Sequence, residues 1–395
     1  MNVLFLTTHF NTGGITSYLL TLSKGFQKEG HRVFVASGGG NRIEALTELG
    51  ISHSTLNIQT KSELNPRIYF ALISLVRLIK DKKIDIVHSQ TRITQVMGTL
   101  LEKMTGAVHV STCHGFFKPR LTRRVLGCWG KAVVAISPQV ENHLIGDLKV
   151  SKEKVFLISN GLDLNDFPMI DEPMRKAARI HHRLSASPVI GIIARLSEVK
   201  GHDVLIRAMK SISERFPSAL LLIVGEGKLD ETLKKRVEEL SLQNHVRFYP
   251  IVNHTFEMLS LLDVFVMPSL QEGLGLSVME AQAAGVPVVA SRVGGILSLI
   301  EDGKTGRLVA PQDQEGLARA IIDLLENRAA AQGMGQAARE FIAKNFSAQT
   351  MVEKTLEMYR TVQETPYLVS IPGMRAAIRT GLKTPVAKCA KKLDW

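Results

Sequence analysis

The stretch Val264-Phe-Val-Met-Pro-Ser-Leu-Gln-Glu-Gly-Leu-Gly-Leu-Ser-Val-Met-Glu280 holds one complete structural unit of this chain. Its first four residues are apolar, which predicts a strand buried on both faces of a sheet. A glycine-rich loop follows the strand, and the loop leads into a helical segment. A strand, a loop and a helix in this order form the repeating unit of a parallel α/β sheet.

Units of this kind recur along most of the chain. Short strands rich in valine and isoleucine alternate with amphipathic helical segments, which is typical of α/β folds. The predicted strands cover residues 3–7, 32–36, 84–88, 108–112, 132–136 and 155–158 in the first half, and 189–194, 219–224, 246–248, 264–267, 286–290 and 307–309 in the second. The predicted helices include residues 16–29, 66–80 and 94–105, and three helical segments close the fold near Val362.

The chain has 395 residues, which is more than one domain usually holds, so we expect two α/β lobes. The alternation breaks from Leu162 to Ser187, a stretch that contains prolines and a charged segment. The predicted parts are a first Rossmann-like domain over residues 1–165, an interdomain connection over 166–187, a second Rossmann-like domain over 188–345, a helix over 346–365 that crosses back to the first domain, and a basic tail over 366–395. Ligands of open parallel sheets bind beyond the carboxyl ends of the strands, so the two sheets are expected to face each other across a cleft.

The chain is basic, with a net charge of +12 and a pI near 9.6. This balance favours polyanionic partners, such as nucleic acid, anionic lipid or phosphorylated substrates. One basic cluster interleaves with aromatic and aliphatic side chains and consists of Lys118, Arg120, Arg123, Arg124 and Lys131. This cluster is either an ordinary solvated surface or a surface that rests on anionic lipid head groups.

Several features of the sequence indicate the cellular compartment of the protein. The three cysteines, Cys113, Cys128 and Cys389, match neither a disulfide framework nor a zinc-binding spacing. The apolar N-terminus lacks a basic region and a cleavage site, which predicts a first strand rather than a signal peptide. No apolar run reaches the ~18 residues of a spanning helix, and the nearest one, Ile68–Ile79, is predicted to be a core helix. We therefore expect a cytoplasmic protein that touches the membrane from that side.

Two loops of the second domain carry candidate ligand-binding groups. Arg195 and Lys200 precede a helix, and two cations beside a helix N-terminus can hold a diphosphate. Glu272 follows a strand, and Glu280 lies eight residues later inside the next helix, where carboxylates can accept hydrogen bonds from sugar hydroxyls. The backbone N–H groups between them suit a phosphate or an oxyanion, and they belong to Gly273, Leu274, Gly275 and Leu276.

Three weaker candidates also follow predicted strands. Gly13 and Gly14 can bring backbone N–H groups close to an anion at a helix N-terminus, although a Gly-Gly pair is often only a turn. His114 follows the 108–112 strand, although by itself such a histidine is more often structural than functional. Gly225 follows the 219–224 strand and permits close approach of the backbone to a ligand.

Taken together, these motifs resemble glycosyltransferase family 4, a large retaining family with the GT-B fold of two Rossmann-like domains. The resemblance extends from the Gly13-Gly14 turn to the C-terminal helices. It is most specific in the Arg195…Lys200 loop and in the Glu272–Glu280 pair, which matches the family's E-x7-E pattern. Asn160-Gly-Leu-Asp163 resembles the family's hinge motif, and Val293-Gly-Gly295 matches one of its later turns.

The resemblance implies a role for each matched position. The first domain would hold the acceptor, with Gly14 donating to the donor diphosphate and His114 reaching the donor sugar. The second domain would hold the nucleotide sugar, with Arg195 and Lys200 neutralising the leaving diphosphate. Glu272 would bind sugar hydroxyls, and Glu280 would hold the ribose. The remaining donor-binding positions would be Gly13, Gly225, Gly273, Leu274, Gly275 and Leu276.

The implied reaction is transfer of a hexosyl or N-acetylhexosaminyl group from a UDP- or GDP-linked donor, with retention of anomeric configuration. Electrostatic stabilisation by Arg195 and Lys200 would make a metal unnecessary, and the sequence has no DxD carboxylate pair to hold one. The expected acceptor is lipid-linked or a glycan in lipopolysaccharide, capsule or glycolipid synthesis at the cytoplasmic face of the inner membrane. No cofactor and no nucleic-acid partner are expected.

The sequence departs from the family pattern in places, and two other functions stay open. Gln90 stands where a second histidine after His88 is common, and Phe248-Tyr-Pro250 stands near the expected base pocket, where a glycine is common. Ile296 begins a stretch where Pro-Glu is commoner. A nucleotide-sugar epimerase or a phosphorylase on the same fold is one alternative. A non-catalytic, membrane-associated scaffold is the other.

Overall fold

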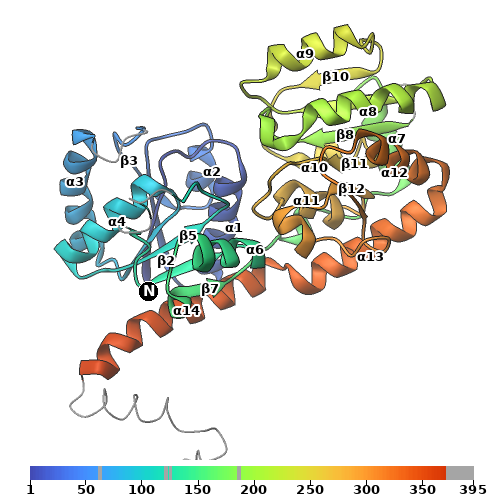
Figure 1. Ribbon diagram of the computed structural model, residues 1–395. Helices are drawn as coiled ribbons and strands as arrows, with labels where there is room; N and C mark the ends of the chain where they lie inside the picture. The colour runs from blue at the N-terminus through green and yellow to red at the C-terminus, as the bar shows by residue number, and fades with distance from the viewer. Residues whose placement is uncertain (61–64, 120–122, 124–126, 185–187, 371–395) are drawn as a thin grey trace, which may run out of the picture.

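A computed structural model describes residues 1–60, 65–119, 123, 127–184 and 188–370, and its two lobes lie side by side (Figure 1). The sheet of the first lobe has seven parallel strands in the order β3-β2-β1-β4-β5-β6-β7. Its strands are β1 (Asn2–Leu6), β2 (Arg32–Ser37), β3 (Ser52–Thr55), β4 (Ile86–Ser89), β5 (Val108–Cys113), β6 (Ala132–Ala135) and β7 (Val155–Leu157). The strands β1, β4 and β6 are almost entirely buried, and β1 and β6 consist mostly of apolar residues, as the sequence predicts.

The sheet of the second lobe has six parallel strands in the order β10-β9-β8-β11-β12-β13. Its strands are β8 (Val189–Ile193), β9 (Leu220–Val224), β10 (Val246–Tyr249), β11 (Val264–Met267), β12 (Val288–Ser291) and β13 (Arg307–Val309). The prediction of two α/β lobes with parallel sheets is therefore confirmed. Every strand expected from the sequence is present. The one that was missed, β3, is a short polar segment at the edge of the first sheet.

Helices flank both sheets. Those of the first lobe are α1 (Gly14–Lys28), α2 (Ile43–Glu48), α3 (Pro66–Lys82), α4 (Arg92–Thr105) and α6 (Pro138–Asn142), which continues as the π-helical turn η1 (His143–Asp147). Those of the second lobe are α7 (Glu172–His181), α8 (His202–Arg215), α9 (Asp230–Glu239), α10 (Thr255–Leu259), α11 (Leu276–Ala283), α12 (Gln314–Glu326) and α13 (Arg328–Asn345). Short helical turns are η2 (Lys152–Lys154), η3 (Leu164–Asp166), η4 (Glu198–Lys200) and η5 (Gly294–Ser298).

Helix α3 is only partly the core helix that its sequence predicts. Asn65 caps its first turn by accepting a hydrogen bond from the Arg67 backbone N–H, and one face of the helix is buried. The opposite face exposes apolar side chains, and the exposed fraction of Phe70 reaches 73%. Among the described residues, no helix combines the length and the hydrophobicity needed to cross a bilayer.

The last helix, α14 (Ala348–Ser370), follows the second lobe in sequence but packs on the first. In Figure 1 it runs beneath the first lobe, from α13 toward the grey tail. Val352 and Tyr359 share an apolar cluster with Phe5, Tyr18 and Phe26 of the first lobe. The helices α1 and α14 touch at Gly25, where a Cβ atom would lie 2.2 Å from Val352 Cγ2. The tail from residue 371 onward lies outside the described residues.

The chain therefore crosses between the lobes twice, and the two crossings are hydrogen-bonded to each other. The Leu162 backbone N–H donates to Phe346 O at 2.9 Å, and the Ala348 N–H donates to Leu162 O at 2.9 Å. Gly161 lies against the second crossing, because a Cβ atom there would be 2.3 Å from Ser347 O. The Asn160–Asp163 motif thus supplies the glycine that lets the crossings approach.

We expect Gly161→Ala to destabilise the chain, because the new methyl group would push the two crossings apart. Overpacking of this kind costs about 1–3 kcal/mol, which equilibrium urea unfolding would measure. The control is Gly146→Ala, where a Cβ atom would meet no atom within 4 Å. Equal stability of the two variants would contradict the steric account of the crossing.

Candidate functional site

The loops that follow the strands of the two sheets meet at the junction of the lobes. A Cβ atom on Gly273 would lie 2.6 Å from the carbonyl oxygen of His114, and one on Gly14 would lie 3.1 Å from Leu276 Cδ1. The Ser137 hydroxyl of the first lobe also donates a hydrogen bond to Gly273 O at 2.7 Å. Predicted site residues of the two lobes are thus brought together.

Lys200 and Glu272, two predicted site residues of the second lobe, form an ion pair. Lys200 Nζ lies 2.5 Å from Glu272 Oε2, and the Ser269 hydroxyl donates to the same oxygen at 3.2 Å. Only 20% of the Lys200 side chain and 12% of the Glu272 side chain are exposed. Both charges are therefore partly withdrawn from water, which strengthens their effect on a bound ligand.

Backbone packing holds this ion pair in place. The loop between β8 and α8 ends at Gly201, whose φ of +71° and closeness to Pro268 favour glycine. A Cβ atom there would lie 1.9 Å from Pro268 O, so the β8–α8 and β11–α11 loops are in contact. Arg195 lies in the first of these loops with an exposed side chain, so the second predicted cation belongs to the same loop as Lys200.

The Glu272 loop rests on the Val293-Gly-Gly295 turn. The Gly295 N–H donates to Glu272 O at 2.9 Å, and a Cβ atom on Gly294 would lie 2.1 Å from that oxygen. Leu274 anchors the loop by burying its side chain in the core of the second lobe. Gly275, at a φ of +105°, is the N-cap of α11, so the loop ends where that helix begins.

Glu280 is buried in α11. The Thr255 hydroxyl, at the first residue of α10, donates to Glu280 Oε2 at 2.9 Å. Burial raises the pKa of the Glu280 carboxyl to about 7, and the hydrogen bond from Thr255 offsets this only in part. This carboxyl consequently changes charge near neutral pH.

Gly225 needs to be glycine for a reason that differs from the prediction. At a φ of +147°, a Cβ atom there would lie 2.1 Å from Ala194 O. Gly227 is similarly close to Leu196 O. Glycine is therefore required at these positions because the backbone packs closely against the protein's own Arg195 loop. Contact with a donor stays a prediction.

In the first lobe, Gly13 is the N-cap of α1 at a φ of +154°, and no atom lies within 4 Å of its Cβ position. His114 packs edge-on against the Tyr18 ring, with 5.1 Å between the ring centroids. His114 Nε2 lies 2.8 Å from Gln90 Oε1. Burial lowers the pKa of His114 to about 3, so the ring is neutral and donates to Gln90, which leaves Nδ1 as an acceptor.

Sequence reasoning missed Gln90 as a functional residue and noted it only as a departure from a family pattern. Gln90 follows the carboxyl end of β4, two residues after His88. This position alone could have marked it as a candidate, because ligands of parallel sheets bind at that edge. The buried Gln90 side chain meets the histidine that follows the neighbouring strand β5. Gln90 therefore orients His114.

A buried polar network extends from this site to α14. His88 Nδ1 lies 2.7 Å from the Tyr359 hydroxyl, and His88 Nε2 lies 2.7 Å from Thr112 Oγ1. Thr112 Oγ1 is also 3.3 Å from the hydroxyl of Tyr18, whose ring contacts His114. Burial lowers the pKa of His88 well below its usual value and raises that of Tyr18 to about 12, so both groups are neutral. Of these residues, only His88 belongs to a motif noted in the sequence; Tyr18, Thr112 and Tyr359 do not.

The aromatic side chains described near the basic cluster of residues 118–131 pack against the protein. The Arg123 guanidinium lies 4.3 Å from the centroid of the Phe117 ring, and Phe116 packs against the His143 ring. Trp129 is buried, so the aromatic side chains of this segment contact the protein rather than extend outward. Lys118 is exposed. Arg120 and Arg124 lie outside the described residues.

Two family models together match most of the chain. The model described as Glycosyltransferase Family 4 matches residues 12–166, and the model described as Glycosyl transferases group 1 matches residues 174–341. The two matched segments lie in the first and second lobes, respectively. Each therefore carries one half of the junction at which the site residues meet.

Two individual relatives share between about a quarter and a third of their aligned residues with this chain. The chain is 35% identical over 210 residues to a GDP-mannose-dependent alpha-(1-6)-phosphatidylinositol monomannoside mannosyltransferase of Mycobacterium tuberculosis, covering 51% of this chain and 54% of that protein. The match thus spans about half the length of that relative. A UDP-Gal:alpha-D-GlcNAc-diphosphoundecaprenol alpha-1,3-galactosyltransferase of Escherichia coli is 28% identical, covering 73% of this chain and 78% of that protein.

A solved structure with a similar fold is that of Anabaena HepE in complex with UDP and glucose. It superimposes with a TM-score of 0.81 over 91% of this chain and 100% of that chain, at 21% identity. Likeness at this identity concerns the fold alone. The prediction of a GT-B fold is confirmed.

We expect Tyr359→Phe to destabilise the protein, because it removes a buried hydrogen bond and leaves His88 Nδ1 without that partner. An unsatisfied buried polar group costs about 1–3 kcal/mol, measurable by urea unfolding. Tyr69→Phe, at a half-exposed tyrosine on α3, is the matched control. If both variants unfold at the same urea concentration, the network does not anchor α14.

Proposed function

Because the chain belongs to the glycosyltransferase family described by the family 4 and group 1 models, we propose that it transfers a sugar from a nucleotide-diphosphate sugar to a hydroxyl group of an acceptor. The observation that carries this proposal is the Lys200–Glu272 ion pair at the lobe junction. A cation for the leaving diphosphate and a carboxylate for sugar hydroxyls lie side by side there. The GT-B fold alone would not distinguish this function from others.

The proposed reaction breaks the bond between the anomeric carbon and the diphosphate oxygen and forms a bond from that carbon to the acceptor oxygen. Arg195 and Lys200 stabilise the charge that develops on the diphosphate. Glu272 accepts hydrogen bonds from the sugar, and Glu280 accepts them from the ribose. The acceptor hydroxyl transfers its proton to the departing phosphate, and the new bond retains the anomeric configuration. The protein groups supply the positive charge, so we propose that no metal takes part.

His114 contributes as a neutral group. Gln90 fixes its Nε2–H, so its Nδ1 can accept a hydrogen bond from a hydroxyl of the sugar or of the acceptor. A neutral imidazole does not compete with Lys200 and Arg195 for the diphosphate. The backbone N–H groups of Gly14 and of residues 273–276 supply the remaining donors to the phosphates.

We propose a hexosyl donor linked to UDP or GDP and a lipid-linked acceptor. The mycobacterial relative is named for GDP-mannose and a phosphatidylinositol mannoside, and the Escherichia coli relative for UDP-galactose and a diphosphoundecaprenol. Both of these names combine a hexose donor with a lipid acceptor. Such an acceptor would place the chain at the cytoplasmic face of a membrane. The exposed apolar side chains Tyr69, Phe70 and Ile73 of α3 are better suited to contact that surface than the packed Phe116 and Phe117.

We expect Lys200→Met to lower kcat/KM for sugar transfer by about 10²–10³-fold, the usual effect of removing one preorganised stabilising group. The matched control is Lys210→Met, which removes an exposed lysine from the same α8 region. Product would be followed by chromatography with UDP-glucose and GDP-mannose as candidate donors, after a thermal-shift screen with UDP and GDP has identified the base. Transfer by Lys200→Met within threefold of the parent chain would overturn the role of this ion pair.

We expect donor affinity to rise with pH. Ribose hydroxyls donate to the ionised form of Glu280, and the pKa of this carboxyl is about 7. If only that form binds, affinity rises about tenfold between pH 6 and pH 8. Calorimetry with UDP-glucose or GDP-mannose measures this directly, because neither donor titrates in that range. The affinity of Glu280→Gln should be low and flat with pH, and a parallel rise in both proteins would refute the assignment.

A further inference from the structure

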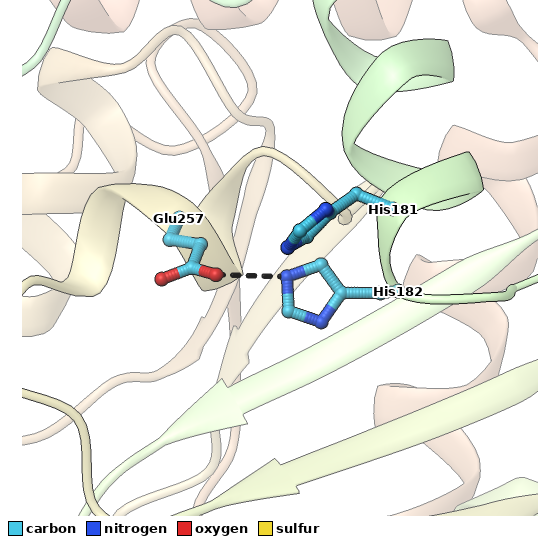
Figure 2. A group of neighbouring side chains, drawn as sticks. All are labelled: His181, His182 and Glu257. Atoms are coloured by element: carbon cyan, nitrogen blue, oxygen red, sulfur yellow. Dashed lines mark hydrogen bonds and ion pairs between the residues drawn. The ribbon is translucent and has the colours of Figure 1, made fainter.

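Three metal-ligating side chains gather on the second lobe. His181 is the last residue of α7, His182 follows it, and Glu257 lies in α10. Figure 2 shows the two imidazole rings and the carboxylate turned toward a common point. One ligand atom from each side chain lies within 4.8 Å of the other two. Elsewhere in the described part of the chain, no group of three such side chains converges in this way.

The spacing suits a transition-metal ion. His182 Nε2 and Glu257 Oε1 are 3.0 Å apart and hydrogen-bonded to each other. Two ligands of tetrahedral zinc, each at ~2.0–2.1 Å from the ion, are about 3.3 Å apart. An ion could thus replace the shared proton of this hydrogen bond with little movement of either side chain. A rotation of the exposed His181 side chain brings in the third ligand.

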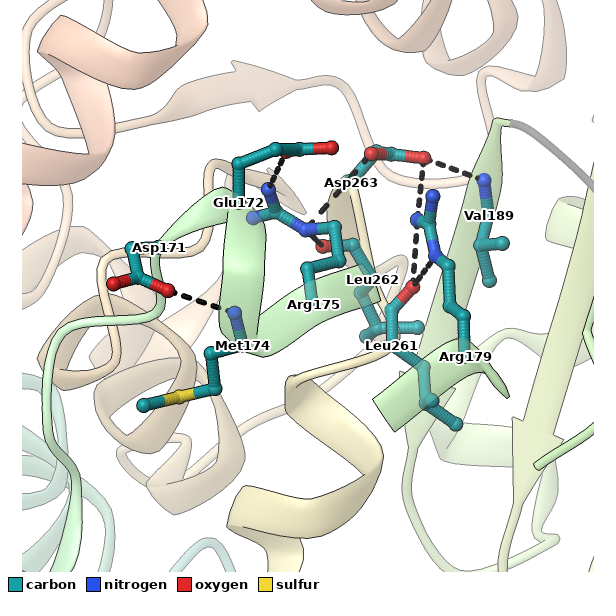
Figure 3. A network of polar contacts seen from close by, with 9 residues as sticks. All are labelled: Asp171, Glu172, Met174, Arg175, Arg179, Val189, Leu261, Leu262 and Asp263. Carbon is teal, nitrogen blue, oxygen red and sulfur yellow. Dashed lines mark hydrogen bonds and ion pairs between the residues drawn. The ribbon is translucent and has the colours of Figure 1, made fainter. Parts of the chain in front are cut away.

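Helix α7 offers a rigid support for the two histidines. Arg179 donates to Leu261 O and pairs with Asp263 Oδ2 at 2.8 Å, while Arg175 donates to Leu262 O at 3.1 Å (Figure 3). Asp263 also accepts the Val189 N–H at the start of β8. Both arginine side chains are largely buried. The helix that ends at His181 is therefore fixed to the sheet of the second lobe.

The carboxylate also comes from a fixed element. Met258 and Leu259, the residues after Glu257, are buried in the core of the second lobe. Thr255, two residues before Glu257, binds the Glu280 carboxylate. The His182 side chain is only 17% exposed, and its ring meets that of Tyr249 edge-on. Ligands held on two packed elements need little reorganisation to bind an ion.

We propose that His181, His182 and Glu257 bind one divalent transition-metal ion of the zinc class, with water completing the coordination. Two imidazoles and a carboxylate are suited to zinc, cobalt and nickel rather than to magnesium or calcium. The bound ion links the end of α7 to α10. None of its three ligands is among the residues assigned to sugar transfer, and we assign the ion a structural role. The proposal stands whether or not the chain is a transferase.

The test uses tag-free full-length protein that has been dialysed against a chelator. Calorimetric titration with ZnCl2 should show one tight site, and zinc should raise the midpoint of thermal unfolding. Replacing the metal by Co²⁺ should give the absorption of a nitrogen- and oxygen-ligated ion, without a thiolate charge-transfer band. His182→Gln and Glu257→Gln should each weaken zinc binding at least tenfold, because each removes one ligand.

The matched control is His245→Gln, which changes a histidine of the second lobe that bonds to Ala219 O instead of facing the cluster. This variant should bind zinc like the parent chain. The proposal fails if the parent protein binds no zinc at millimolar concentration. It also fails if zinc affinity is unchanged in the doubly substituted His181→Gln, His182→Gln protein, or if cobalt shows thiolate ligation, which would assign the binding to cysteine.

Discussion

The hydrogen-bonded contact between the two crossings is the constraint on which the rest of the structure depends. The candidate site residues are divided between the two lobes. The geometry of the site therefore depends on the position of one lobe relative to the other. Leu162 binds the backbone of Phe346 and Ala348, and Gly161 allows this approach. Because the two crossings lie together, a rotation of one lobe relative to the other would pivot at this contact. The loops at the junction could then move apart and return to the same positions relative to each other.

The two sides of the junction differ in their electrostatic character. In the first lobe the buried groups near the site are neutral, because burial depresses the pKa values of His88, His109 and His114. The second lobe contributes the Lys200–Glu272 ion pair and the Glu280 carboxyl, whose pKa burial raises to about 7. This division matches the proposed substrates, since a charged nucleotide sugar would lie on the second lobe and a neutral acceptor hydroxyl would approach from the first.

The sequence predicted the fold well, because buried parallel strands are continuous apolar runs that local patterns reveal. It missed β3, whose polar residues at a sheet edge carry no such pattern. It identified the family and both members of the Lys200–Glu272 pair, but their contact depends on loop packing through Gly201 and Pro268. It gave no sign of the Tyr359–His88–Thr112 network, because these residues are 24 and 271 positions apart and meet only in the folded chain. It left open whether the basic cluster near Arg123 is a solvated or a lipid-facing surface, and it did not reveal that Trp129 is buried, because sequence alone does not give burial.

The position of α14 makes the first lobe discontinuous in sequence. Its core includes Val352 and Tyr359, which the ribosome adds only after the whole second lobe has been synthesised. The second lobe, in contrast, comes from one continuous stretch of the chain, from α7 to α13. During translation the second lobe can therefore complete its core before α14 is made. At that stage the apolar surface of α1, in the first lobe, is not yet covered by α14. Until α14 has been synthesised, the α1 face that it covers is exposed to solvent, and exposed apolar surface of this kind favours aggregation of a partly folded chain.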